Sequence, residues 1–143
     1  MMKKVLLILF LIVGYCEVSQ AQSIIVNAQN STITIPSKFV KDIFIGNMTR
    51  WKNNSLIEVV DYNANTELRT EFTAKYIEMS VMRVYKNWIR LSLSAEVAPP
   101  KIFHTQQEVI DFVSKNANAI GYIKDRQLIS KDSSVKEVKI LEK

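Results

Sequence analysis

Few side chains in this sequence could carry out a chemical reaction. The 143 residues contain one histidine, His104, and one cysteine, Cys16. Catalysis and metal binding need clustered acid, base, nucleophile or ligand groups, and the sequence has no such cluster. His104 directly precedes the pattern Thr105-x-x-Glu108, which predicts a helix start, so we interpret His104 as the residue flanking that start. These observations argue against an enzyme and predict neither a cofactor nor a metal site.

The first 21 residues predict a secretory signal peptide. A basic start precedes nine apolar residues, Val5 to Val13, and the small-residue pattern Ser19-Gln20-Ala21 follows. A helix that crosses a bilayer needs about 20 apolar residues, so this run is too short to be a membrane anchor. We therefore expect cleavage after Ala21 and one exported domain, periplasmic or fully secreted, over 22–143.

Cys16 leaves a second interpretation open for the N-terminus. A bacterial lipoprotein signal also ends at a cysteine, but it has a small residue directly before it, and this chain has Tyr15. A lipid anchor at Cys16 is therefore the minority interpretation. Cleavage after Ala21 leaves a domain with no cysteine, and hence no disulfide and no thiolate metal site.

The charge of the chain restricts its partners only weakly. There are 19 basic and 14 acidic residues, a formal net charge of +5. Without Lys3, Lys4 and Glu17 the counts are 19 − 2 = 17 and 14 − 1 = 13, a net charge of about +4. The basic residues are scattered and form no run, so nucleic acid is not an expected partner, and at most a mild preference for anions follows.

The apolar pattern predicts strands that alternate with helices. Strands are expected at 23–27, 57–60, 101–103, 119–123 and 135–141, and helices at 37–45, 66–78, 81–92 and 105–116. This order argues for an α/β domain with a mixed β-sheet flanked by helices. Alternating apolar and charged residues predict that 135–141 is a half-exposed edge strand, and 61–65 is expected to be a polar connection.

Helical spacing also predicts which side chains are buried. In the first helix these are Phe39, Val40, Ile43 and Phe44, and in the third helix they are Val81, Tyr85, Trp88, Ile89 and Ser92. Ser80 is expected to cap the third helix. Gly46 stands where a helix is expected to end in a left-handed glycine.

Three short motifs, taken in order, resemble a known family. The first motif, Ile43 to Trp51, follows the pattern I-F-x-G-x-x-x-x-W. The second is the predicted helix that contains Trp88, and the third is the predicted strand with the sequence Asn118-Ala119-Ile120-Gly121-Tyr122-Ile123. This combination resembles the phosphate-binding proteins of bacterial ABC transporters, over about 24–123. The resemblance implies the fold of one lobe of a type II periplasmic binding protein. It also implies phosphate or a related anion as ligand, and a transporter or another envelope protein as partner.

The resemblance places the ligand chemistry at the start of the helix that carries Phe72. Family members have R-x-x-x-S-G-T-T-x-x-F there, where the arginine pairs with phosphate and hydroxyl and backbone N–H groups complete its hydrogen bonds. When the phenylalanine of this pattern is aligned with Phe72, its R, S, G, T and T positions correspond in this chain to Tyr62, Thr66, Glu67, Leu68 and Arg69. The ligand set implied for this chain is Asn63, Asn65, Thr66 and Arg69.

Several of these residues depart from the family pattern. Glu67 brings a negative charge to the first helical turn, Leu68 has no hydroxyl, and Tyr62 cannot form a bidentate ion pair. Arg69 is better interpreted as a solvated surface residue, and Thr66 as a helix cap, than as ligands. The 143 − 21 = 122 residues expected after cleavage also hold no counterpart of the family's first lobe.

Two functions remain open at this stage. The chain is either a small solute-binding protein of the phosphate-binding class or a non-transport envelope interaction module that has lost the ligand site. A basic, convergent pocket at the start of the Thr66 helix would favour the first function. An exposed apolar patch of several hundred Å² would favour the second.

Overall fold

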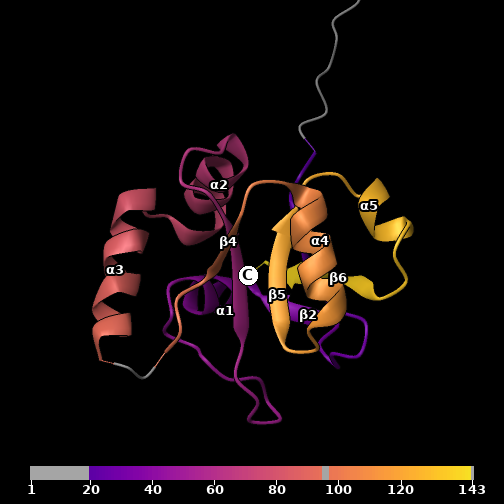
Figure 1. Ribbon diagram of the computed structural model, residues 1–143, viewed down its shortest axis with the longest axis horizontal. Helices are drawn as coiled ribbons and strands as arrows, with labels where there is room; N and C mark the ends of the chain where they lie inside the picture. The colour runs from indigo at the N-terminus through magenta and orange to yellow at the C-terminus, as the bar shows by residue number, and fades with distance from the viewer. Residues whose placement is uncertain (1–19, 95–96, 143) are drawn as a thin grey trace, which may run out of the picture.

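A six-stranded mixed sheet forms the centre of the computed structural model, which describes residues 20–94 and 97–142 (Figure 1). The strands are β1 Ser23–Asn27, β2 Thr34–Pro36, β3 Glu58–Tyr62, β4 Lys101–Phe103, β5 Ala119–Ile123 and β6 Val135–Leu141. The helices are α1 Ser37–Phe44, α2 Glu67–Phe72 with a π-helical continuation Thr73–Ile77, α3 Val81–Leu93, α4 Gln106–Lys115 and α5 Gln127–Ser130. The predicted α/β class with a mixed sheet is confirmed. The predicted signal peptide and Cys16 lie outside the described residues.

The strand order is β2-β6-β1-β5-β3-β4. β1 pairs antiparallel with both β5 and β6, whereas β3 pairs in parallel with β4 and β5. The prediction that 135–141 is an edge strand is wrong, because the short strand β2 pairs in parallel with β6 and covers its outer side. The alternation of β6 therefore reports one solvated face of the strand, not its place in the sheet.

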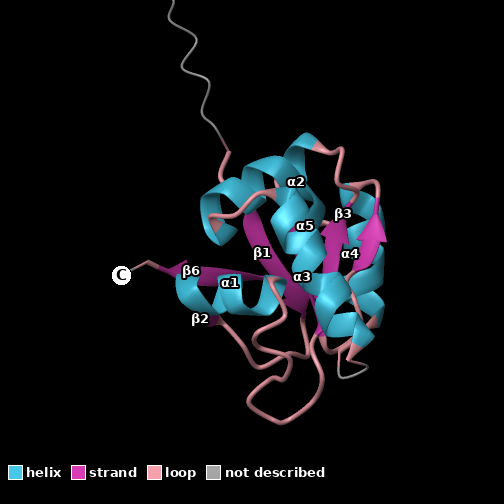
Figure 2. Ribbon diagram, turned by 90° about the vertical axis from the view of Figure 1, so that its left-hand side faces the viewer, coloured by secondary structure: helices cyan, strands magenta, loops and turns pink. Residues whose placement is uncertain are grey.

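Helices cover both faces of the sheet, and Figure 2 shows β1 and β3 between α1 on one side and α4 on the other. Gly121 lets α4 approach closely, because a Cβ atom there would lie 2.9 Å from Cγ1 of Val109. The opposite face holds an aromatic cluster, in which Phe72 stacks on Tyr122 with ring centroids 3.6 Å apart and Phe44 meets both rings edge-on. This cluster connects α1 and α2 to the centre of the sheet.

Gly46 ends α1 as predicted, with φ at +83°. It also lies against α3, since a Cβ atom at Gly46 would lie 3.1 Å from the ring of Trp88 and would overlap Leu91. The Nε1–H group of Trp88 donates to the carbonyl oxygen of Phe44 at 2.8 Å. The end of α1 therefore fixes the position of α3. The expectation that Phe39 is buried with the rest of α1 is wrong, because its side chain is exposed.

The buried face of α3 differs from the predicted one. Ser80 caps the helix as expected, accepting a hydrogen bond from the backbone N–H of Arg83. The buried side chains are Val84 and Trp88, with Leu91 partly buried, whereas Tyr85 and Ile89 are exposed. The apolar stripe of α3 is wider than one face, so helical periodicity alone could not select the face that packs.

The start of α4 agrees with the sequence. Thr105 and Glu108 form the predicted capping box, in which Oε2 of Glu108 accepts from the backbone N–H groups of His104 and Thr105. In the part of the chain that the structure describes, no helix is long and apolar enough to cross a membrane.

Candidate functional site

The predicted ligand residues lie where β3 ends and α2 begins. The turn between them is held together by its own polar groups, and Asn63 is the centre of these bonds. Its carbonyl oxygen accepts from the backbone N–H and the hydroxyl of Thr66, and its Oδ1 accepts from the N–H of Asn65. The predicted cap at Thr66 is wrong in its chemistry, because the hydroxyl donates to Asn63 and makes no cap hydrogen bond to α2.

Arg69 turns inward from the first turns of α2. Its side chain is buried, its Nη1–H group donates to the carbonyl oxygen of Tyr62 at 2.9 Å, and its Nε lies 3.4 Å from Oδ2 of Asp61. The prediction of a solvated Arg69 is therefore wrong. The only cation in the predicted ligand set is neutralised by a carboxylate that the sequence had placed in a polar connection.

Asp61 and Tyr62 belong to β3 and are both buried. Oδ1 of Asp61 accepts from the hydroxyl of Tyr122 at 2.6 Å and from the backbone N–H of Tyr62 at 2.8 Å. Burial raises the pKa of Asp61 above its ordinary value, while Arg69 and the two hydrogen bonds act in the opposite direction. The hydroxyl of Tyr62, at the family's arginine position, donates to the carbonyl oxygen of Tyr122 at 2.8 Å.

Burial also raises the pKa values of both tyrosines, with the carboxylate of Asp61 as the next cause. Both hydroxyls therefore stay protonated and act as donors at neutral pH. Asp61, Arg69, Tyr62 and Tyr122 form one buried polar network beneath the turn, which we call the Asp61–Arg69 network. Sequence reasoning missed it because Asp61 was assigned to the polar connection 61–65 and not to the strand before it. The available signal was Tyr62, a large aromatic residue that extends the apolar segment beyond Val60.

A groove opens beside this network, between α3 and the edge strand β4. Its volume is about 490 Å³. Tyr85, Ile89 and Leu93 of α3 form one wall, and Ile102 of β4 and the residues Pro99 and Pro100 before it form the other. Arg69 and Asn63 reach its floor. Figure 1 shows α3 at the β4 side of the sheet, away from α4 and α5.

The groove gathers several of the exposed apolar side chains of the described residues. Nine large apolar side chains are exposed in all, and four of them line the groove, namely Tyr85, Ile89 and Leu93 on α3 and Ile102 on β4. Leu93 is 83% exposed and Tyr85 53%. The surface beside the α2 start is therefore apolar, and it is not the basic, convergent pocket that an anion site predicts.

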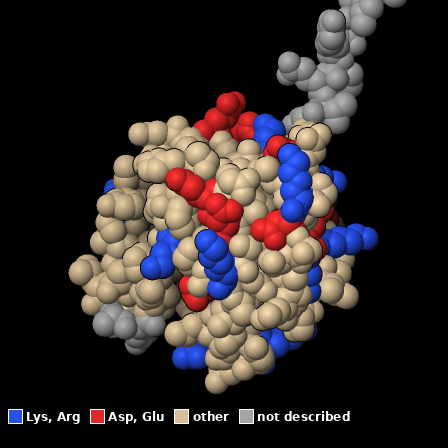
Figure 3. Space-filling view, turned by 45° about the vertical axis from the view of Figure 1, so that its right-hand side comes forward, with Lys and Arg blue, Asp and Glu red and all other residues tan. Residues whose placement is uncertain are grey.

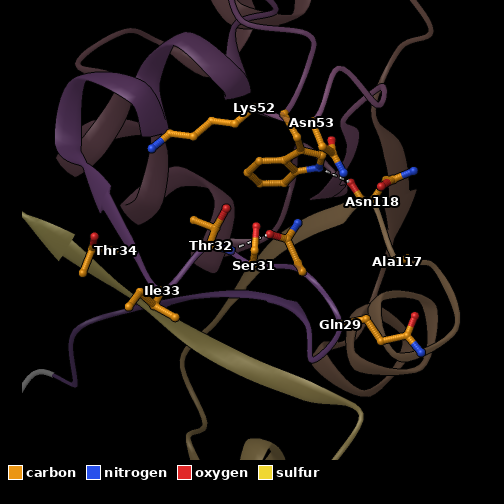
Figure 4. A pocket seen from close by; sticks show the side chains of 11 residues that line it. Gln29, Ser31, Thr32, Ile33, Thr34, Lys52, Asn53, Ala117 and Asn118 are labelled. Atoms are coloured by element: carbon orange, nitrogen blue, oxygen red, sulfur yellow. Dashed lines mark hydrogen bonds between the residues drawn. The ribbon is translucent and has the colours of Figure 1, made fainter.

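A second pocket, of about 460 Å³, lies between the segment 29–34 that connects β1 to β2 and the loops that precede β3 and β5 (Figure 4). Several of its polar side chains form hydrogen bonds with the backbone of the loops that surround it. Nε1–H of Trp51 donates to the carbonyl oxygen of Asn118, and Oδ1 of Asn30 accepts from the N–H of Thr32. These hydrogen bonds stabilise the loops, which lie at the opposite end of β3 from the ligand residues that the resemblance implies.

Neither a charged patch on the face shown in Figure 3 nor a cluster of metal-ligating side chains among the described residues indicates a further binding site. Figure 3 shows acidic and basic side chains interspersed over one face of the molecule, without a region of a single sign. Among the described residues no group of three histidine, cysteine or carboxylate side chains could hold a metal ion. Asp111 and Glu108 are exposed on α4.

Comparisons with solved structures identify the fold. An ABC-type phosphate transport receptor from Vibrio cholerae superposes with a TM-score of 0.63 at 22% identity, over 83% of this chain and 45% of that one. A protein assigned as a phosphate ABC transporter substrate-binding protein from Clostridium perfringens, solved with bound phosphate, gives 0.67 at 23% identity, over 83% and 44%. PstS from Borrelia burgdorferi gives 0.65 at 14% identity, over 84% and 47%.

These matches confirm the predicted resemblance at the level of fold. The chain spans less than half the length of each matched protein, and it has the architecture of one part of a phosphate ABC transporter substrate-binding protein. One of the matched proteins is described as a transport receptor and another as a substrate-binding protein. No protein-family model matches the chain, and no curated protein matches it by sequence.

Proposed function

We propose that this chain is an exported envelope module with the fold of a phosphate-binding-protein lobe, and that it acts by binding another protein instead of carrying phosphate. The predicted signal peptide over residues 1–21 supports export, and the fold supports a periplasmic or secreted domain over 22–143. The ionic and hydrogen-bonding groups at the start of α2 then serve the fold itself. The exposed apolar groove beside them is the surface for a partner.

The observation that carries this proposal is the position of Arg69. Phosphate recognition uses a guanidinium group that is directed at the ligand and not already neutralised. Here Asp61 neutralises Arg69 within the protein, and the carbonyl oxygen of Tyr62 takes one of its donors. Glu67, exposed in the first turn of α2, would repel an incoming anion. An anion bound at this turn would meet two carboxylates and one compensated cation.

Binding of phosphate or a related anion for uptake or sensing is the second candidate. The similarity to phosphate-binding proteins favours it, and the ligand roles of Asn63, Asn65, Thr66 and Arg69 stay predictions. In this case an ABC transporter or a sensor in the envelope would be the partner. The two candidates differ in one property that can be measured, namely whether the protein contacts its partner through a defined surface without any anion.

Photocrosslinking in cells of the native host tests the proposal. A benzoylphenylalanine is introduced at one exposed apolar position on each of three surfaces, replacing Leu93 on α3, Phe39 on α1 or Leu56 before β3. A protein adduct of one defined mass, formed from one of these surfaces in phosphate-depleted cells, is the expected result. The proposal is contradicted if no position gives an adduct while the purified protein binds phosphate saturably.

A further inference from the structure

The edge strand β4 carries one residue whose backbone is directed away from the sheet. Phe103 pairs with Tyr62, and its carbonyl oxygen accepts from the N–H of Asn63 at 3.0 Å. In a parallel ladder alternate residues bond to the neighbouring strand, so Lys101 and Phe103 face β3 while the N–H and C=O groups of Ile102 point outward. Within residues 20–94 and 97–142 no hydrogen bond to these two groups is found.

These two outward groups lie on the wall of the apolar groove. The side chain of Ile102 is 46% exposed and lines the groove together with Tyr85, Ile89 and Leu93 on the facing helix. An unpaired strand edge beside an apolar surface matches an extended peptide, whose backbone pairs with the edge and whose alternate side chains enter the groove.

The charges on the two elements that form the groove define the partner further, although none of their basic side chains lines the groove itself. The floor is neutral overall, because Asp61 compensates Arg69. Helix α3 contains Arg83, Lys86 and Arg90 and no acidic residue, and β4 contributes Lys101 beside Ile102. All four basic residues are exposed. Acidic residues that flank an apolar segment would therefore be attracted to this surface, whereas basic flanks would be repelled.

We propose that the groove between α3 and β4 binds an extended segment of a partner protein, apolar at alternate positions and flanked by acidic residues, which adds to the sheet as a strand beside β4. This inference rests on the proposed function and specifies its surface and its partner. A lipid chain would fill the apolar groove equally well, but it would leave the N–H and C=O groups of Ile102 without partners. Pairing at Ile102 therefore distinguishes the peptide from a lipid.

The test uses a seven-residue peptide of alternating valine and threonine with a glutamate at each end. Binding is followed by the NMR signals of the backbone amides of Ile102 and Leu93 while the peptide is titrated. A second peptide has the same sequence with alternate backbone nitrogens methylated, which removes its donors and keeps its side chains. Octanoate serves as the lipid-like probe. The expected result is saturable binding of the unmodified peptide that shifts the Ile102 amide, with at least about tenfold weaker binding of the methylated peptide.

Two pairs of variants test the groove from the protein side. Ile102→Pro removes the outward donor without removing a bond to β3, and Ile102→Val keeps it. Leu93→Asp places a charge in the groove, and Leu56→Asp places the same charge on a different surface. Ile102→Pro and Leu93→Asp are expected to weaken peptide binding about tenfold, while their matched controls change it less than about twofold. If Ile102→Pro does not fold, the methylated peptide gives the same information.

Three outcomes overturn the inference. The unmodified peptide does not bind, or both peptides bind equally well, or octanoate binds in the groove while the peptide leaves the Ile102 amide unshifted. These outcomes are distinct from failure of the proposed function. A protein adduct from any of the three crosslinking positions would keep the proposed function while strand addition at β4 is rejected.

Discussion

Arg69 and Asp61 decide the chemistry of the α2 start. Both side chains are 93% buried, and a buried ion pair gives little net stability, although removing one partner leaves an uncompensated buried charge. Arg69 also donates to the backbone of Tyr62 at the end of β3. Its main effect is therefore to hold α2 against the strand, in the position where the resemblance predicted ligand residues.

Arg69→Met is expected to lower the free energy of unfolding by about 3 kcal/mol at pH 7, because it leaves Asp61 buried without its cation. The loss should depend on pH. Burial already raises the folded pKa of Asp61, and removal of Arg69 raises it further. The folded protein therefore takes up a proton at a higher pH than the unfolded chain. The destabilisation is relieved as the pH falls toward the unfolded value, and it grows as the pH rises through the folded pKa.

Urea unfolding of the wild type and of Arg69→Met at pH 7 and pH 5 measures this effect. The double variant Asp61→Asn, Arg69→Met is the control, since it removes both charges, keeps an Oδ1 acceptor for the Tyr122 hydroxyl and should be more stable than Arg69→Met alone. A destabilisation that is equal at the two pH values would contradict the assigned role of Asp61.

The fold also requires a glycine at position 46, where the backbone is left-handed. Gly46→Ala is expected to lower the free energy of unfolding by about 2 kcal/mol or more, since a left-handed backbone costs a non-glycine residue about 1–2 kcal/mol. Overlap of the new Cβ with Leu91 adds to this loss. Thermal unfolding measures the change. Leu91→Ala in the Gly46→Ala background should recover part of it, and no recovery would mean that α3 does not lie against Gly46 as described.

Among the elements, α4 begins with a capping box in its first turn. The backbone N–H groups of His104 and Thr105 lower the pKa of Glu108. The stabilisation by Glu108 is therefore present above its ordinary pKa of 4.5 and is lost as the pH falls through the lower, folded value. Glu108→Gln should remove this acid-side dependence. Unfolding curves between pH 3 and pH 6 measure it, and identical pH profiles for the two proteins would argue against the capping box.

Elements with strong local sequence patterns were predictable, but the way in which elements pack against one another was not. The capping box at Thr105, the glycine at Gly46 and the apolar run of β5 each have a local cause, so the sequence located them. The place of β6 depends on β2, a strand of three residues with little pattern of its own. The buried face of α3 depends on Phe44 and Gly46, which lie more than 40 positions away along the chain.

The candidate site was predictable in position but not in chemistry. The family resemblance indicated the turn from Asn63 to Arg69, and the structure brings these residues together at the end of β3. That Arg69 turns inward to Asp61 follows from tertiary packing under Tyr122, which no local spacing encodes. The apolar groove was missed for the same reason, because Tyr85 and Ile89 were assigned to the core of the protein.

At the scale of the whole molecule, the described chain behaves in this account as one cooperative unit. A single aromatic cluster joins α1, α2 and β5, and α3 is joined to the end of α1 through Trp88. Residues 22–143 are therefore expected to unfold in one transition, with far-UV circular dichroism and tryptophan fluorescence giving the same midpoint. Separate midpoints would show that α3 and Trp88 unfold independently of the sheet.

We propose that the start of α2 has a structural role and that the protein works through a protein contact. The most direct test is a calorimetric titration of the protein from Gln22 onward with orthophosphate in phosphate-free buffer. We expect no saturable heat up to millimolar phosphate. Micromolar binding that is lost in the variant Thr66→Ala, Arg69→Ala would contradict it, and would instead assign the α2 start to an anion receptor.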